Sequence, residues 1–484
     1  MTGPATRRAW LAELAWSPRL GLQRNVLIEA EAGRFTAVSP DAAAARPEPD
    51  RAGPDPAGLD RAGPDRAGLD RAGLDRATRL RGLTIPGLAN AHSHAFHRAL
   101  RGTTQASRGT FWTWRERMYE VAARLDPDSY LALARAVYAE MTLAGISCVG
   151  EFHYLHHGPG GTPYADPTAM GRALVQAAAD AGLRISLLDT CYLAGGLSPD
   201  GRPLELAGPQ LRFGDGDGAR WAARVEALGD PGPGARVGAA IHSVRAVPPD
   251  QMAAVTGWSH QHAAPVHAHL SEQVAENVAC LAAYGRTPAQ ILLDAGALGP
   301  RTSVVHATHL TAADISVLGQ SQSYACFCPT TEADLADGIG PASALTAAGS
   351  PLTLGSDSHA VIDLLAEARG VELGERLASQ ERGHFTAAEL ACAATVAGHA
   401  SLGWPEAGQL APGGLADLVT VRLDSVRTAG ATDATALESV IFGATAADVT
   451  DVVIGGRDVV RDGEHLLLAD VPGRLGTAIR AVLG

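Results

Sequence analysis

Short apolar runs alternate with longer amphipathic stretches through the middle of the chain. The runs are rich in Val, Ile, Leu and Ala, which is typical of buried strands, whereas the stretches between them show the apolar spacing of helices. Helices are predicted, for example, at residues 130–144, 167–181, 217–228 and 272–284. The predicted strands are residues 83–91, 146–153, 184–192, 236–242, 265–269, 302–306, 323–328 and 351–357.

This alternation of strands and helices predicts the fold. Repeated β/α units favour a parallel sheet, and a series of this length predicts an α/β fold with a (β/α)8 TIM-like barrel at residues 86–404. Residues 1–85 and 405–484 contain short strands and tight turns instead. We expect these two end segments to join in a small composite β-sandwich beside the barrel.

A pentapeptide repeat interrupts the N-terminal segment. It runs from Arg51-Ala-Gly-Pro-Asp55 to Arg71-Ala-Gly-Leu-Asp75 and offers little apolar surface to bury. We therefore expect a disordered surface insert at about residues 46–78, without a function of its own.

Composition and charge exclude several classes of function. The net charge of −13 and the pI near 5.7 argue against a nucleic-acid or anionic-membrane partner. No run of about 20 apolar residues could span a membrane, and none follows Arg7-Arg8 as a secretory signal would require. We therefore expect a cytoplasmic protein, and the scattered cysteines are typical of reduced core thiols. The chain contains no lysine, which excludes Schiff-base, P-loop and carbamylated-lysine chemistry.

Polar residues gather where the predicted barrel strands end, and the active site of such a barrel lies at those ends. His92 and His94 are two residues apart, so both imidazoles project from the same face of an extended backbone. With His269 and Asp357 they would place three imidazoles and one carboxylate around one divalent cation, Zn²⁺ first and Fe²⁺ as the alternative. Bound zinc lowers the pKa of its water from about 16 to about 7 and so supplies hydroxide.

Three side chains are candidates for proton transfer. Glu272 lies just past the fifth strand, over the barrel mouth, where a relayed proton is worth about 100- to 10,000-fold in rate. Its alternative role is a carboxylate in the first turn of the following helix, favoured by the helix dipole. His306 would polarise the substrate, and Asp357 could also accept the proton of the attacking water. His267 is expected to point away from His269, while His309 and His359 are expected to have supporting or surface roles.

Several motifs together resemble the amidohydrolase superfamily, in its mononuclear deaminase branch. The resemblance covers nearly the whole chain except the pentapeptide insert, and the absence of lysine agrees with a one-metal site. The motifs are Pro86-Gly-Leu-Ala-Asn-Ala-His-Ser-His94, His267-Ala-His-Leu-Ser-Glu272, Val304-Val-His306, Leu354-Gly-Ser-Asp357 and Gly408-x-Leu-x-x-Gly-x-x-Ala-Asp417.

Within that branch, residues 111–116, 151–157, 242–245 and 328–332 resemble the formimidoylglutamate deiminases of histidine degradation. The resemblance implies that hydroxide attacks the formimidoyl carbon of N-formimidoyl-L-glutamate while Glu272 relays the proton, giving N-formyl-L-glutamate and ammonia. We also expect a homodimer with a small dianionic substrate. The residues implied to hold the glutamate part are Arg115, Tyr154, His242 and Arg245, and His97 stands where the family pattern has a glutamine that contacts the substrate.

The residue types agree with such a substrate, but other readings remain open. Two arginines at the mouth of an acidic protein can form bidentate pairs with two carboxylates, although Arg115 and Arg245 could instead form surface or interdomain salt bridges. A deaminase or chlorohydrolase acting on guanine, S-adenosylhomocysteine or a triazine would need an aromatic or amide-lined pocket. The remaining alternatives are an imidazolonepropionate hydrolase and a barrel that lost its chemistry, which would show gaps among the ligands.

Overall fold

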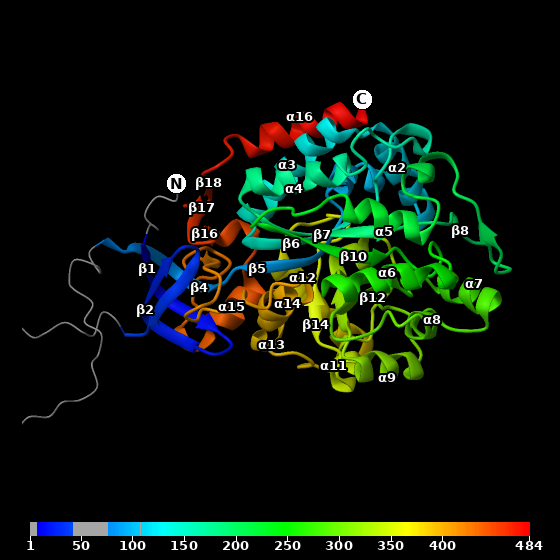
Figure 1. The fold of residues 1–484 in the computed structure, drawn as a ribbon. Helices are drawn as coiled ribbons and strands as arrows, with labels where there is room; N and C mark the ends of the chain where they lie inside the picture. The colour runs from blue at the N-terminus through cyan, green and yellow to red at the C-terminus, as the bar shows by residue number, and fades with distance from the viewer. Residues whose placement is uncertain (1–6, 42–75, 107) are drawn as a thin grey trace, which may run out of the picture.

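The computed structural model describes residues 7–41, 76–106 and 108–484 (Figure 1). The pentapeptide repeat therefore lies outside the described residues, as does the predicted insert up to residue 75. The last residue predicted for that insert, Thr78, is instead the first residue of a strand.

A parallel eight-stranded sheet forms the larger part of the molecule. Its strands follow the order β14-β13-β12-β11-β10-β7-β6-β5, so each strand lies beside the next barrel strand along the chain. An isolated parallel bridge between Ser93 and Asp357 joins the two outermost strands at their carboxyl ends. This closure confirms the predicted barrel. The strands are β5 (Leu88–Ser93), β6 (Ile146–His153), β7 (Arg184–Cys191), β10 (Ala235–Ile241), β11 (Val266–Leu270), β12 (Thr302–His306), β13 (Tyr324–Phe327) and β14 (Leu352–Leu354).

Helices connect the barrel strands on the outside of the sheet (Figure 1). The predicted helix at residues 272–284 begins at Val274, so Glu272 precedes the helix and is not part of its first turn. The helices are α2 (Phe111–Arg124), α3 (Pro127–Leu143), α4 (Ala169–Ala181), α5 (Gly218–Glu226), α6 (Pro249–His262), α7 (Val274–Tyr284), α8 (Pro288–Asp294), α9 (Ala312–Ser321), α10 (Pro329–Asp334), α11 (Ala342–Ala348), α12 (Leu364–Ser379), α13 (Ala387–Cys392) and α14 (Gly398–Ser401).

Segments from both ends of the chain form a second, separate eight-stranded sheet. Its order is β18-β17-β16-β15-β4-β1-β2-β3, and the antiparallel pair β4–β15 joins the N-terminal to the C-terminal strands. The two ends therefore build one unit beside the barrel, as predicted. Its strands are β1 (Arg8–Ser17), β2 (Gly21–Glu31), β3 (Arg34–Ser39), β4 (Thr78–Pro86), β15 (Leu418–Val421), β16 (Val449–Ile454), β17 (Arg457–Arg461) and β18 (Glu464–His465).

The first predicted barrel strand, residues 83–91, was wrong as a single element. Leu83 to Pro86 pair with β15 in the terminal sheet, and the barrel strand starts only at Leu88. The chain crosses between the sheets at Gly87, where a Cβ atom would lie 2.4 Å from Ser147 Oγ. Only glycine fits this approach, and the Pro86-Gly87 pair marks the break in the sequence.

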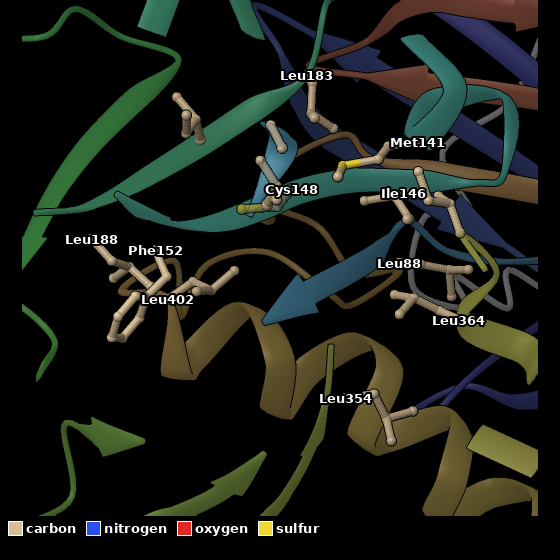
Figure 2. Close-up of a cluster of buried hydrophobic side chains, with 14 of the residues drawn as sticks. Leu88, Met141, Ile146, Cys148, Phe152, Leu183, Leu188, Leu354, Leu364 and Leu402 are labelled. Atoms are coloured by element: carbon tan, nitrogen blue, oxygen red, sulfur yellow. The ribbon is translucent and has the colours of Figure 1, made fainter. Parts of the chain in front are cut away.

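Apolar side chains pack along the first barrel strands. Figure 2 shows Phe152 near the carboxyl end of β6 beside Leu188 and Leu402, while Ile146 and Cys148 of β6 and Leu88 of β5 lie nearer the amino ends. All six cysteines are free, in agreement with the prediction of reduced thiols. The C-terminal helix α16 (Val471–Leu483) lies along α3 (Figure 1). None of the helices in the described ranges has the length and apolar character needed to cross a bilayer.

Candidate active site

The four predicted metal ligands lie together at the carboxyl end of the barrel. Asp357 Oδ1 is 3.2 Å from His92 Nε2 and 3.3 Å from His94 Nε2. The Nε2 atoms of His92 and His269 are 3.1 Å apart. His306 also contributes to this group, because His92, His269, His306 and Asp357 each offer an atom within 4.8 Å of the others.

Hydrogen bonds on the far side of two imidazoles fix which nitrogen faces the cluster. His94 Nδ1 donates to Phe152 O (2.9 Å) and His269 Nδ1 donates to His242 O (3.0 Å), because a carbonyl can only accept. In the neutral rings the Nε2 lone pair of His94 therefore faces the carboxylate of Asp357, and the Nε2 lone pair of His269 faces His92 Nε2. Such an arrangement repels itself unless a cation lies among the lone pairs, so the residues present fit a divalent metal ion.

Burial keeps these imidazoles neutral, which is the form that binds metal. Burial lowers the pKa of His92 to about 3, and it also lowers the pKa values of His94 and His269. Although burial opposes ionisation of Asp357, the hydrogen bond with His92 holds the pKa of that carboxyl well below its usual range. Three imidazole nitrogens and one carboxylate oxygen form a donor set typical of zinc.

Glu272 and His306 lie next to the cluster and complete a proton-transfer group. Glu272 Oε1 is 3.8 Å from His306 Nε2, and His306 Nδ1 is 3.3 Å from Glu332 Oε1. Burial raises the pKa of Glu272, whereas the positive charges of His306 and Arg245 oppose that rise. Burial also disfavours charging of His306, but the carboxylates of Glu272, Glu332 and Asp357 outweigh it and raise the pKa of His306 well above its ordinary value.

The predicted substrate-binding residues line one pocket that opens onto this cluster. His97 Nε2 lies 2.9 Å from the Tyr154 hydroxyl, and the ring of His242 packs on that of Tyr192 with centroids 4.3 Å apart. The guanidinium of Arg115 lies 4.6 Å from the centre of the Trp112 ring, and Arg115 forms no ion pair with any carboxylate of the described residues. The pocket is lined by His94, His97, Phe111, Trp114, Arg115, Met118, Tyr119, Tyr154, Tyr192, Phe213, His242, Arg245, His269, Glu272, His306 and Asp357.

Arg245 differs from Arg115 because it already faces two carboxylates. Its Nη2 is 3.6 Å from Glu272 Oε2, and its Nε is 3.7 Å from Glu276 Oε2. Both distances are longer than direct hydrogen bonds. Although burial opposes its charge, Glu276 and Glu272 raise the pKa of Arg245, so this guanidinium enters the pocket with part of its charge already balanced.

Three other histidines are placed as supporting residues. His267 Nε2 donates to Ser401 O (3.2 Å), and the ring lies outside the cluster although His267 is two residues before His269 on β11 and shares its strand face. The buried ring of His359 lies between Ser93 Oγ (3.2 Å) and Ser356 Oγ (3.0 Å), and His309 Nε2 donates to the backbone oxygen of Asp337 (2.8 Å). The supporting roles of His309 and His359 were predicted, as was a hydrogen-bonding role for His267, but the prediction that His267 points away from His269 overlooked that residues two apart share a strand face.

Sequence reasoning missed several carboxylates and the aromatic wall of the pocket. Glu151 accepts hydrogen bonds from Ser93 Oγ and Ala95 N, both 2.7 Å, and thereby fixes the end of β5 that carries the first two histidines. Glu276, Glu332 and Asp337 were given no role. The position after a strand end would have identified Tyr192, which follows β7. No comparable signal marks Tyr119 or Phe213, because they come from connecting segments.

The comparisons with known proteins agree with this geometry. Residues 83–459 match the model of the amidohydrolase family. The chain is 38% identical over 403 residues to formimidoylglutamate deiminase of Pseudomonas aeruginosa, covering 80% of this chain and 86% of that protein. It is also 33% identical over 413 residues to 8-oxoguanine deaminase of the same species, covering 83% of this chain and 88% of that protein.

Solved structures show the same fold. An amidohydrolase from Brucella melitensis superposes with a TM-score of 0.84 at 31% identity, over 99% of this chain and all of that one. A mutant atrazine chlorohydrolase of Arthrobacter aurescens, complexed with zinc and atraton, has a TM-score of 0.82 at 21% identity, over 98% and 99% of the two chains. The family match, the barrel and the histidine–aspartate cluster lead to one conclusion: the chain belongs to the amidohydrolase family.

Proposed function

We propose that this protein hydrolyses N-formimidoyl-L-glutamate to N-formyl-L-glutamate and ammonia. The observation that carries the proposal is one pocket that combines a cluster suited to a divalent cation with two arginine side chains. The metal cluster suits hydrolysis of a C=N bond, and the two arginines suit the two carboxylates of a glutamate. The relative at 38% identity bears that activity in its name, which supports the same choice.

His92, His94, His269 and Asp357 would hold the metal, which is Zn²⁺ in this proposal. A cation in such a site supplies a Lewis acid that lets water lose a proton near neutral pH. Glu272 takes up that proton and returns it to the departing nitrogen. His306, kept protonated beside Glu332, donates a hydrogen bond where negative charge develops, and Asp357 also accepts from the water.

Arg115, Arg245, Tyr154, His242 and His97 would bind the glutamate part. Arg115 has no carboxylate partner in the described chain, so its guanidinium is available to a substrate carboxylate. The Tyr154 hydroxyl and His97 Nε2 form a hydrogen-bonded pair beside it. Nδ1 of His97 is buried without a partner, so this ring can also donate to the substrate, as the glutamine of the family pattern would.

Substitution of Arg115 by Ala should raise the KM for formimidoylglutamate by about 10- to 100-fold with little change in kcat, because a charge-assisted hydrogen bond is lost. The matched control is Arg117→Ala on the same helix, since Arg117 is exposed and pairs with Glu120. Steady-state kinetics of the three proteins measure the effect. An unchanged KM in R115A would remove Arg115 from the binding site. R245A should also weaken substrate binding. It is a less specific test than R115A, because it also leaves Glu272 and Glu276 without a counter-ion.

A second candidate is deamination of a purine-like ring, and one feature of the pocket favours it. Phe111, Trp114, Tyr119, Tyr154, Tyr192 and Phe213 all line the pocket, and aromatic walls suit flat rings. The relative at 33% identity is named for 8-oxoguanine. The arginines weigh against this candidate, because a neutral ring gives them no anionic partner.

One assay separates the two candidates. The zinc-loaded protein is incubated with formimidoylglutamate, 8-oxoguanine, guanine and S-adenosylhomocysteine, ammonia is measured, and products are identified by mass spectrometry. The proposal predicts ammonia and N-formylglutamate from the first compound at a kcat/KM at least about 100-fold above that of any ring, since a ring without a carboxylate would cover the pocket arginines and leave them without an anionic partner. Glutamate and formamide as products, or turnover of rings alone, would reject it.

A further inference from the structure

Two tyrosines of the pocket wall share one hydrogen-bond donor behind them. Gln210 Nε2 lies 3.0 Å from the Tyr119 hydroxyl and 3.2 Å from the Tyr192 hydroxyl. Both tyrosines line the pocket, whereas Gln210, in the short helix η4 (Gly208–Arg212), does not. The two hydroxyl oxygens therefore lie close together at the pocket, with the side-chain amide of Gln210 behind them.

Backbone groups fix which end of the Gln210 amide faces the tyrosines. Ala207 N, which can only donate, lies 3.3 Å from Gln210 Oε1, and Gly195 O, which can only accept, lies 3.2 Å from Nε2. The amide oxygen and nitrogen therefore cannot be exchanged in this position. Because an amide nitrogen donates and does not accept, the two hydroxyls can accept from Gln210 but cannot donate to it.

This orientation leaves a hydroxyl proton for the pocket. Each tyrosine hydroxyl carries one proton, and neither proton can go to Gln210. One hydroxyl can donate to the other, since both lie within 3.2 Å of the same nitrogen, but the proton of the second hydroxyl then remains. Burial raises the pKa of Tyr192, an effect that the charge of Arg245 opposes, so this hydroxyl keeps its proton at neutral pH. At least one O–H donor is therefore available to a ligand.

Both pocket arginines lie near the tyrosine pair. The guanidinium of Arg115 lies 5.7 Å from the centre of the Tyr119 ring, and both residues belong to α2. Arg245 is close enough for its charge to act on the hydroxyl of Tyr192. An O–H donor beside guanidinium groups suits an oxyanion, and a carboxylate has two oxygens, so it can accept from a guanidinium and a hydroxyl at the same time.

We propose that the hydroxyls of Tyr119 and Tyr192, oriented by Gln210, donate a hydrogen bond to a carboxylate of the substrate. The pair would act together with Arg115 or Arg245, so that a neutral donor and a guanidinium recognise the same group. This inference rests on the proposed function and deepens it, since formimidoylglutamate has one carboxylate beside the reacting group and one at the far end. It also gives two members of the aromatic wall a role other than stacking on a flat ring.

Binding of the product N-formyl-L-glutamate to the zinc-loaded protein, measured by titration calorimetry, tests the tyrosines without turnover. The double variant Tyr119→Phe/Tyr192→Phe should raise the Kd by about 10- to 100-fold, because a hydrogen bond to a charged group is lost while both rings remain. The matched control is Tyr164→Phe, since the Tyr164 hydroxyl accepts from Arg212 and Tyr164 does not line the pocket. With formimidoylglutamate, the double variant should raise the KM and leave kcat nearly unchanged.

Two monoamides of the product show which carboxylate the tyrosines contact. N-Formyl-L-glutamine lacks the side-chain carboxylate, and N-formyl-L-isoglutamine lacks the α-carboxylate. The loss of affinity in the double variant should persist with the monoamide that retains the contacted carboxylate and largely disappear with the other. Gln210→Leu should repeat this dependence on the ligand with a smaller loss, because it leaves both hydroxyls in place without the donor that orients them.

The outcomes separate this inference from the proposed function. An unchanged Kd in the double variant, or equal losses with both monoamides, would overturn the inference even in a protein that hydrolyses formimidoylglutamate. A loss that depends on one carboxylate, in a protein inactive on formimidoylglutamate, would keep the carboxylate site and reject the function. A wild-type protein that binds neither the product nor its monoamides would reject both.

Discussion

Glu272→Gln should lower kcat by about 100- to 10,000-fold while the protein keeps its full complement of metal. The amide has nearly the same shape as the carboxylate, but it cannot take a proton from water and return it to the leaving nitrogen. Glu272 lies 3.8 Å from His306 and lines the pocket, but it is not among the residues grouped as possible metal ligands. Metal content by elemental analysis and ammonia release by a coupled assay measure both effects.

Glu276→Gln is the matched control for this variant. Glu276 is also buried and also faces Arg245, but it does not line the pocket. Its replacement should change kcat by less than about tenfold, because it removes one charge beside Arg245 and no proton carrier. Comparable losses in E272Q and E276Q would show that charge balance around Arg245, rather than proton transfer by Glu272, limits turnover.

The metal cluster was predictable because parallel strands bring their carboxyl ends to one edge of a barrel. His94, His269 and Asp357 are far apart in the chain, yet each lies at or just past the carboxyl end of a strand, so position relative to a strand end was sufficient to group them. The same rule placed Glu272 and His306. The break within the predicted strand 83–91 was missed, although Pro86-Gly87 is typical of a turn and the predicted barrel begins at residue 86. The close packing of Ser147 behind Gly87, where the chain changes sheet, depends on tertiary structure.

The electrostatic surroundings of the site were much harder to predict. Glu276 belongs to α7 and Glu332 to α10, and an acidic residue in a helix is usually solvated. Nothing in the local sequence shows that Glu276 is 2% exposed and faces Arg245. The sequence therefore suggested two free arginines, whereas one of them lies beside two buried carboxylates. Burial of a charge is decided by tertiary packing, and a single sequence carries little signal for it.

His269→Asn should remove the metal and reduce turnover to the uncatalysed background. Loss of a supporting hydrogen bond to a metal ligand alone commonly costs about 10- to 100-fold in affinity, so loss of a ligand should cost more than about 100-fold. Elemental analysis after dialysis should find well below one metal ion per chain. Because His269 Nε2 lies 3.1 Å from His92 Nε2, His92 should lose its neighbour in the cluster as well.

His267→Asn, two residues away on the same strand, is the control that makes this test decisive. His267 is also fully buried, but its ring donates to Ser401 O (3.2 Å) and is not part of the histidine–aspartate cluster. H267N should lower the free energy of unfolding by about 1–3 kcal/mol, measured by urea denaturation, and retain its metal. Equal metal contents in H267N and H269N would contradict the assignment, because His269 lies in the cluster beside His92, whereas His267 is hydrogen-bonded to Ser401.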